Sequence, residues 1–521
     1  MVSWSNLGLK KRPEPDAMHH NEKKHLNLLL SNYIRSSALI DYYSNSTNKT
    51  QFSSMKKAYD IAIIGSGIVG SSSALQLSRK GYKVLVLDSN RSPGFGTTSY
   101  SSSITRSCYT NYDSVKTAYE GYHHLKNWRD FVQLPKSEET AKLVDMKALL
   151  IKTPNSIDFI NKTVPLMEKA GVPGEYLSYE ETKKWMENMG GQINDVYKPR
   201  LISDENFGLP EANMKCEGGY LSHAAGYMND PQLAARNMAE ASSKFSSSKT
   251  PAEFKFGAKV VEILLSDSTE PQIAGLKLDN GEIIHAPIVM NAAGPYSSMI
   301  NKMAFENNNI KHDTNVNCRV LRQEVVTVQA PEGVDFMKNK KARNALFDID
   351  NGFYLRPEVS TNKFLIGSAE PDCDTLDYIE SNNPDDINYN LSEESTTHIW
   401  RAALRFPNLP IPSSKNTQGI VSCYDASDDW TPIYDKSKIK GYYLAHGTSG
   451  NQFKNAGVIG KIMERIITGV ENGHDHDKQA LKLDLEYTFR GNYGKDAEEN
   501  RINLGQFSRL REKGVGSNVM G

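Results

Sequence analysis

The hydrophobic positions take up a regular spacing from about residue 59 onward. A short apolar run at 61–64 ends in glycine, a stretch with helical spacing starts at Ile68, and a second apolar run covers 84–87. A strand, a helix and a strand within about thirty residues form a βαβ unit, which forces its two strands to be parallel. The pattern therefore predicts an α/β fold.

Weaker patterns predict the remaining elements. Residues 113–209 indicate mostly polar helices, and 253–298 indicate strands with a hairpin turn at Asn280-Gly281. A long amphipathic helix is expected at 454–468, and the segment from 471 onward is charged. Further strands are expected at 320–328, 352–355, 364–367 and 441–445.

Residues 1–54 are rich in Ser, Asn, Lys and His and poor in aliphatic side chains. One apolar patch between Leu26 and Ile34 has helical spacing and basic neighbours, as in a mitochondrial presequence. Acidic residues around it argue against that interpretation, because transit peptides avoid acids. We expect a disordered or targeting extension over 1–54, or a working start at Met55.

Composition narrows the class of protein. The 521 residues suggest two or three domains. With 61 Lys+Arg against 62 Asp+Glu, nucleic acid and anionic membranes are poor partners. No apolar run approaches the roughly 18 residues of a membrane span. Five scattered cysteines without a C-x-x-C pair fit a reducing compartment, so we expect a cytoplasmic protein, with mitochondria as the alternative.

The turn of the βαβ unit carries three glycines with nucleotide-binding spacing. Gly65 makes the tight turn out of the strand, Gly67 lets the backbone approach a pyrophosphate, and Gly70 allows close helix–strand packing. The helix start at Ile68 and Val69 offers N–H groups to phosphates.

Asp88 ends the second strand, 23 residues after Gly65, where an acid accepts the ribose hydroxyls. The unit therefore predicts a bound dinucleotide. NAD and FAD both place adenosine diphosphate on such a unit, so the choice depends on the rest of the chain.

Six further motifs follow in order along the chain. They are the Ser-rich loop 97–109, Gly226–Pro231, Met290–Ser298, Gly352–Pro357, Asp429–Pro432 and Gly447–Lys454. Together they resemble the FAD-dependent D-amino acid oxidase superfamily, especially its glycine oxidase, sarcosine oxidase and dimethylglycine dehydrogenase branch. The resemblance covers most of residues 59–470.

The resemblance implies an α/β fold, with a Rossmann-like FAD-binding domain and an interleaved antiparallel-sheet substrate domain. The FAD-binding domain is expected at 59–112, 210–315 and 418–470, the substrate domain at 113–209 and 316–417, and a tail at 471–521. It also implies FAD contacts from the Ser-rich loop, the 290–298 segment and the glycine-rich C-terminal motif. These contacts are Thr97, Thr98, Ser99, Ala293, Gly294, Gly447, Ser449, Gly450 and Phe453.

In the sarcosine oxidase pattern, the arginine that ends the flavin loop and the lysine of the C-terminal motif hold the substrate carboxylate. Arg106 and Lys454 stand at the matching positions, and such a pair suits a small carboxylate in a dry pocket. Two solvated surface cations are the alternative. Tyr354 is expected to face the substrate or to be buried aromatic packing.

Departures from the family pattern limit what is carried over. The cysteine that attaches flavin in sarcosine oxidases aligns with Ser422, one residue before Cys423, so we expect non-covalent FAD. The oxygen-activating lysine falls near Leu365, so superoxide formation is less favoured, and a dehydrogenase that passes electrons to a carrier stands as an alternative to an oxidase. The pocket histidine maps near Ser368 or Ala369, which indicates a changed substrate. Gln452 replaces a family glycine.

No metal site is expected. His123 and His124 are adjacent on a helix and point in different directions, so they cannot chelate one ion together. His474 and His476 lie in a polar loop without further ligands. His446, beside the glycine-rich turn, is either a flavin contact or structural.

The resemblance implies hydride transfer to FAD from a small amino acid or N-alkyl amino acid, with oxygen or an electron carrier as the final acceptor. The alternatives are a 2-hydroxy-acid or polyol dehydrogenase on the same fold, and a flavin-bearing assembly factor with vestigial catalysis.

Overall fold

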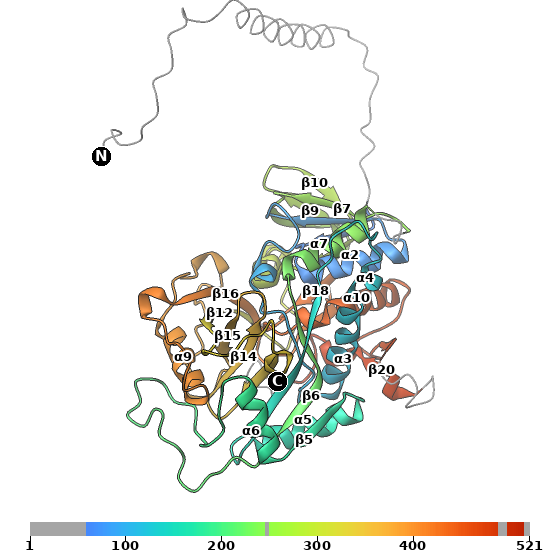
Figure 1. Cartoon of the computed structure of the whole chain (residues 1–521). Helices are drawn as coiled ribbons and strands as arrows, with labels where there is room; N and C mark the ends of the chain where they lie inside the picture. Colours follow the sequence, from blue (N-terminus) through green and yellow to red (C-terminus); the bar gives the residue numbers. More distant parts are fainter. Residues whose placement is uncertain (1–58, 245–248, 488–496, 515–521) are drawn as a thin grey trace, which may run out of the picture. The chain divides into compact units, whose positions relative to one another are not determined.

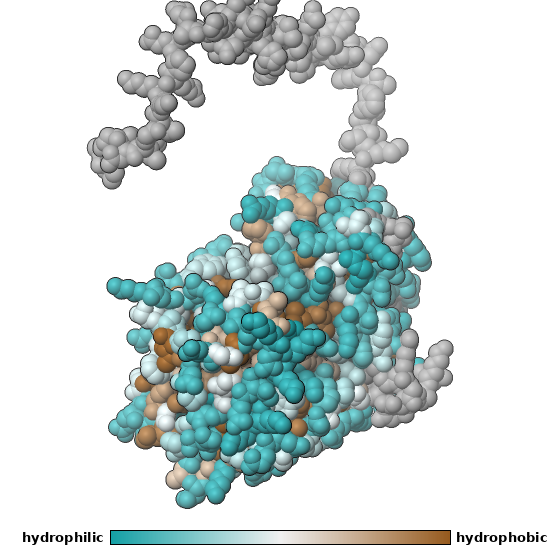
Figure 2. Space-filling view, viewed as in Figure 1, coloured by the Kyte–Doolittle hydropathy of each residue, from teal (hydrophilic) through white to brown (hydrophobic). Residues whose placement is uncertain are grey.

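The computed structural model describes residues 59–244, 249–487 and 497–514. The extension expected over 1–54, its apolar patch and Met55 lie outside these residues. Within the described ranges, no helix combines the length and the apolar character needed to cross a bilayer. The face seen in Figure 2 is largely hydrophilic, with hydrophobic side chains gathered near its middle.

A six-stranded sheet has the order β17-β18-β11-β1-β2-β7, and its pairs are parallel except for β17 with β18. The strands are β1 (Ile61–Ile64), β2 (Val84–Asp88), β7 (Glu253–Phe256), β11 (Ile288–Asn291), β17 (Ile433–Lys436) and β18 (Tyr442–His446). With helix α2 (Ile68–Lys80) between β1 and β2, the predicted βαβ unit is confirmed.

Both faces of this sheet are covered (Figure 1). Ile61 and Ile63 of β1 share a core with α2 and α10 (Ala456–Glu471), while α7 (Pro231–Ser243) packs beside α2. The alternate residues, Ala62 and Ile64, pack with a small sheet on the other face. A strand buried on both faces needs apolar residues throughout, which explains the unbroken run at 61–64.

The small sheet is antiparallel, with the order β10-β9-β8. Its strands are β8 (Val260–Leu265), β9 (Ile273–Leu278) and β10 (Ile283–His285). Since β9 and β10 pair across Asn280-Gly281, with Gly281 at a φ of 84°, the predicted hairpin is confirmed.

A second large sheet has nine strands in the order β16-β12-β15-β14-β13-β4-β6-β3, with β5 also paired to β6. All its pairs are antiparallel except β13 with β4. Its strands are β3 (Ile104–Thr105), β4 (Leu143–Lys152), β5 (Gly174–Leu177), β6 (Gly218–Met228), β12 (Cys318–Gln329), β13 (Asn344–Asp348), β14 (Phe353–Glu358), β15 (Lys363–Ser368) and β16 (Gln418–Ser427). This sheet confirms the expected α/β architecture with an antiparallel second layer.

The prediction of mostly helical structure over 113–209 is wrong in part. Helices α3 (Tyr112–Lys126), α4 (Trp128–Val132), α5 (Ile157–Lys169) and α6 (Tyr179–Asn188) lie there. However, 143–152 forms β4, and 190–217 contains no helix. The β4 sequence is rich in Leu, Lys and Ala, but pairing with β6 and β13 on its two sides outweighs that local preference.

The remaining described elements include α8 (Ser297–Ala304), α9 (Glu393–Arg405) and the hairpin of β19 (Lys482–Asp484) and β20 (Arg501–Asn503). The segment after β20 docks through Arg509, which is 2% exposed and contacts Asp313, Asp435 and Asp477. The described residues 501–514 of the charged C-terminal sequence are therefore part of the packed structure.

Candidate functional site

The glycine-rich turn has no room for side chains at two of its positions. Gly65 has a φ of 102°, and a Cβ there would lie 2.3 Å from the carbonyl oxygen of Ala292 at the end of β11. A Cβ at Gly70 would lie 1.9 Å from the carbonyl oxygen of Gly65. These close approaches bring the carboxyl ends of β1 and β11 together, where nucleotides bind in parallel sheets.

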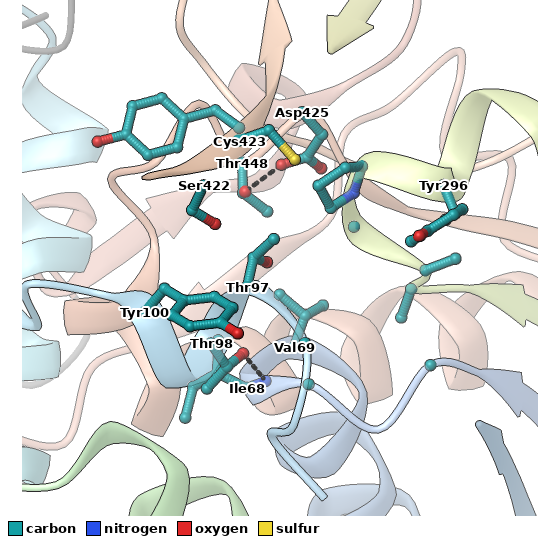
Figure 3. A pocket seen from close by; sticks show the side chains of 18 of the residues that line it. Ile68, Val69, Thr97, Thr98, Tyr100, Tyr296, Ser422, Cys423, Asp425 and Thr448 are labelled. Atoms are coloured by element: carbon teal, nitrogen blue, oxygen red, sulfur yellow. Dashed lines mark hydrogen bonds between the residues drawn. The ribbon is translucent and has the colours of Figure 1, made fainter. Parts of the chain in front are cut away.

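Polar side chains hold this turn in place. The Oδ2 atom of Asp88 accepts hydrogen bonds from the main-chain N and the Oγ of Ser66, both at 2.7 Å. The Ile68 N–H at the start of α2 donates to the Thr98 hydroxyl at 3.0 Å (Figure 3). Asp88, Ile68 and Thr98, which are expected to contact a nucleotide, therefore also hold the glycine-rich turn through hydrogen bonds.

A long cavity runs from the end of β2 to the glycine-rich turn before α10, and we call it the cofactor cavity. The predicted site residues among those that line it are Gly65, Gly67, Ile68, Val69, Asp88, Thr97, Thr98, Ala293, Gly294, Tyr354, Gly450 and Phe453. Gly70, Ser99, Gly447 and Ser449 are not in its described wall; Ser449, for example, hydrogen-bonds Asp425 and Ser427 behind it.

Strand β16 supplies a part of the wall that the sequence motifs did not identify. Ser422, Cys423, Tyr424 and Asp425 all line the cavity, and the Thr448 hydroxyl donates to Asp425 Oδ1 (Figure 3). The sequence did contain one signal for this part of the wall. The alignment of Ser422 with the flavin-attaching cysteine of sarcosine oxidases could have indicated that the residues next to it, Cys423 to Asp425, also lie near FAD.

Asp425 provides a test of whether FAD suits the cavity. The side chain is 4% exposed, burial raises its pKa, and Oδ2 has no hydrogen-bond partner among the described residues. Buried polar atoms of this kind are rare in proteins unless a ligand or water meets them. FAD carries ribityl hydroxyls and ring amide groups that can meet Oδ2, so the residues present fit this cofactor.

The environment of Cys423 bears on covalent attachment. Burial, followed by the charge of Asp425, raises the pKa of its thiol to about 12. Because the thiolate is the nucleophilic form of cysteine, a protonated thiol beside the flavin favours non-covalent binding.

Arg106 and Lys454 converge on the ring of Tyr109. The Arg106 guanidinium lies 4.5 Å from the ring centroid, and the Lys454 ammonium lies 5.1 Å from it. Both side chains are buried, at 5% and 3% exposure, so they are not the solvated cations of the alternative interpretation. Arg106 also donates to the Cys108 carbonyl oxygen at 2.6 Å, and Lys454 donates to that of Asn451.

Burial and the neighbouring guanidinium both disfavour the ammonium form of Lys454. Burial, followed by the charge of Arg106, lowers the pKa of Lys454 well below its usual range. Tyr354 lines the cofactor cavity, and its ring packs on Gly367, where a Cβ would lie 2.6 Å from the ring. Arg106, Lys454 and Tyr354, which the sequence singled out, are therefore all buried. Tyr354 lines the cofactor cavity, whereas Arg106 and Lys454 are not among its lining residues.

The histidines have structural contacts. His446 is 4% exposed and lies 3.2 Å from the amide of Asn301, away from the described cavity wall. His476 is buried, unlike the polar-loop position expected, and its Nδ1 accepts from the Leu481 N–H at 3.0 Å.

Glu120, His124 and Glu486 cluster closely enough to hold an ion. The Lys461 Nζ atom lies 3.2 Å from His124 Nε2 and 2.5 Å from Glu486 Oε1. The ammonium group therefore supplies the positive charge that a metal ion would otherwise bring to these carboxylates.

A curated relative aligns with about half of the chain. The hydrogen cyanide synthase subunit HcnC of Pseudomonas aeruginosa is 24% identical over 278 residues. The alignment covers 48% of this chain and spans 61% of the length of that relative.

Solved structures with below 25% identity share the fold. L-Proline dehydrogenase from P. horikoshii has a TM-score of 0.61 and 18% identity, covering 80% of this chain and 95% of its own. Glycine oxidase from Geobacillus kaustophilus has a TM-score of 0.57 and 18% identity, covering 81% and 97%. L-α-Glycerophosphate oxidase from Mycoplasma pneumoniae, with FAD bound, has a TM-score of 0.57 and 14% identity, covering 79% and 95%.

The family described as FAD dependent oxidoreductase (DAO) matches residues 60–466, a range that includes both large sheets and the cofactor cavity. FAD is accordingly the cofactor. The chain belongs to this family of FAD-dependent oxidoreductases.

Proposed function

We propose that the protein oxidises the C–N bond of an amino acid or N-alkyl amino acid, with FAD held non-covalently in the cofactor cavity. The observation that carries this proposal is the convergence of Arg106 and Lys454 on one buried aromatic ring. We assign FAD binding to the six-stranded sheet. We assign substrate binding to the buried region around Arg106, which directly follows β3 of the nine-stranded sheet.

Arg106 and Lys454 have complementary parts in this proposal. The guanidinium offers a planar fork to a carboxylate, and the lysine adds a point charge. Because the pKa of Lys454 is lowered, the arrival of an anionic substrate favours its charged form and draws a proton onto Nζ. The two cations then fix the orientation of the substrate, which lowers the entropy cost of reaching the reactive geometry.

Bound FAD supplies the hydride acceptor for the reaction. Gly450 and Phe453, which precede α10, line the cavity next to Lys454 in the sequence. The main-chain N–H groups and the positive end of the helix favour negative charge there. Buried aromatic side chains, including Tyr354 and Tyr109, exclude water from the region. The imine product is released and hydrolysed in water, and oxygen or an electron carrier completes the cycle.

A 2-hydroxy acid is the second candidate substrate. The same two cations would hold its carboxylate, and the similar fold of the glycerophosphate oxidase indicates that this scaffold can accommodate oxidation of a hydroxyl-bearing compound.

The test is anaerobic titration of the purified holoprotein with amino, N-methylamino and 2-hydroxy acids, followed by flavin absorbance. Reduction by amines supports the proposal, and reduction by hydroxy acids alone would replace it with the second candidate. Readmission of air then separates an oxidase from a dehydrogenase.

Arg106→Ala is expected to raise the half-saturating concentration of the reducing substrate about 10- to 100-fold, since a charge-assisted hydrogen bond is lost. Arg129→Ala is the control, because Arg129 bonds the main chain at Pro135 and Glu138 on another part of the surface. An Arg106 variant with unchanged half-saturation would remove the anchor from this proposal.

A further inference from the structure

A second cavity adjoins the cofactor cavity, and we call it the outer cavity. It has a volume of about 1160 Å³, and the side chain of Gln452 belongs to the walls of both cavities. Gln452 is held firmly, because its Oε1 accepts from the Tyr434 hydroxyl at 3.2 Å and from the Asn455 amide at 2.7 Å. The residue that replaces the family glycine thus lines both cavities.

Two residues that line the outer cavity each carry a buried oxygen atom without a partner among the described residues. These atoms are the hydroxyl of Tyr109 and Oδ1 of Asn455, on side chains that are 6% and 4% exposed. Buried polar atoms rarely lack a hydrogen-bond partner in proteins, so these two atoms point to a ligand. Since the Asn455 amide nitrogen already donates to Gln452, the free atom is an acceptor, and the ligand must bring a donor.

The outer cavity also lies against the proposed carboxylate site. Tyr109, which lines it, is the ring on which Arg106 and Lys454 converge. Asn451, which lines it too, accepts the hydrogen bond from Lys454. A substrate gripped at its carboxylate can therefore extend its far end toward this cavity.

The charges around the outer cavity select among donors. Two of its lining acids are Asp158 and Asp372, and Lys162 is the one lysine among the described lining residues. A third lining acid, Asp429, is paired with Arg511 at 2.8 Å. Among the lining residues themselves the acids outnumber the lysine, which disfavours a distal carboxylate there. The cations Arg106 and Lys454 lie beside the ring of Tyr109, where the proposal places the substrate carboxylate.

Building on the proposed function, we propose that the outer cavity binds the distal N–H donor of a long amino-acid substrate, an ammonium or a primary amide, through Asn455 Oδ1 and the Tyr109 hydroxyl. The substrate class is then a diamino acid or an amino-acid amide, in place of the smallest amino acids.

The experiment compares lysine and glutamine with norleucine, glutamate and alanine, each as both enantiomers. Norleucine matches lysine in length without its ammonium, and glutamate matches glutamine with the wrong charge. In anaerobic titrations, we expect lysine or glutamine to reduce the flavin at a half-saturating concentration about tenfold below that of norleucine.

Asn455→Leu is expected to remove this preference, so that lysine and glutamine have the same half-saturating concentration as norleucine. Tyr109→Phe, which deletes only the hydroxyl, is a second variant should Asn455→Leu fail to fold. Ser114→Ala is the matched control, because it removes a hydroxyl from the same wall.

Binding is measured independently from the rise in melting temperature that each compound causes. An amine with the predicted preference that binds without reducing flavin supports the outer-cavity assignment and contradicts the proposed function. Norleucine equal to lysine and glutamine in both measurements overturns the assignment, as does a preference that survives both Asn455→Leu and Tyr109→Phe.

Discussion

The lowered pKa of Lys454 couples substrate binding to pH. Burial and the neighbouring Arg106 disfavour the ammonium in the free protein, whereas a bound carboxylate favours it. Carboxylate binding should therefore take up a proton, and affinity should fall as pH rises above the pKa of free Lys454, by up to about tenfold per pH unit.

Titration calorimetry of an inert carboxylate ligand, in two buffers with different ionisation enthalpies, measures this proton uptake. The control is Lys454→Met, in which the uptake should disappear. Equal proton uptake in the variant would show that another group carries the effect.

Among individual residues, those whose function in nucleotide binding depends on local sequence spacing could be predicted. Gly65 and Asp88 are separated by one βαβ unit, so their positions follow from the motif. Asp425 and Asn455 could not be found in this way. Their importance arises from unpartnered atoms, and a missing hydrogen-bond partner becomes visible only when distant segments have been brought together.

Among the elements, α9 is tied to the nine-stranded sheet by a buried ionic group. Arg405 near its end donates to Asp348 at 2.7 Å and to Asp350 at 3.2 Å, and all three side chains are 1% exposed. Burial, followed by the charge of Asp348, raises the pKa of Asp350. Thr153, at the end of β4, also donates to Asp350 at 2.6 Å, so the group joins a helix to two strands.

Arg405→Ala is expected to lower the free energy of unfolding by about 3–5 kcal/mol, because it leaves buried carboxylates without their cation. Denaturant-induced unfolding of the holoprotein measures the change. Glu393→Gln, at the exposed start of the same helix, should change it by less than about 0.5 kcal/mol. An Arg405 variant as stable as this control would show that the aspartates are satisfied by other groups.

The elements were predicted unevenly for a physical reason. β1 and α2 have strong periodicity of their own, and hydrophobic spacing was sufficient to find them. β4 has a composition that also suits a helix, and its conformation is decided by hydrogen bonds to β6 and β13. Such pairing joins Lys147 to Asn344, a partnership that no local pattern encodes.

At the scale of the whole molecule, ion pairs from the segment 501–514 connect parts of the chain that are far apart in sequence. Arg509 contacts Asp313 at 2.6 Å, Asp435 at 3.1 Å and Asp477 at 2.8 Å, while Arg511 contacts Asp429. Burial by itself raises the pKa of Asp477, but hydrogen bonds from Arg509 and Lys436 outweigh it and hold the pKa at about 2.

Arg509→Ala is expected to lower the free energy of unfolding at neutral pH by about 3 kcal/mol or more, since buried carboxylates lose their cation. The folded-state pKa of Asp477 lies below its unfolded value, so its contribution is present above about pH 4 and is lost toward about pH 2. The difference between wild type and variant should therefore shrink on acidification.

Denaturant unfolding at several pH values tests both statements. Lys513→Ala, which breaks an exposed pair with Asp428, is the control and should have little effect at any pH. A stability difference that stays constant down to pH 2 would assign the Arg509 effect to packing.

The order of strands in the six-stranded sheet has a consequence for protein synthesis. Ile61 pairs with Ile288, and Val289 in turn pairs with Tyr442, so β1 leaves the ribosome more than two hundred residues before β11 and well before β18. The turn before α10, which closes the cofactor cavity, emerges later still. A nascent chain therefore cannot form the complete cofactor cavity until Phe453 has left the ribosome, and until then the strands of this sheet lack neighbours that complete it.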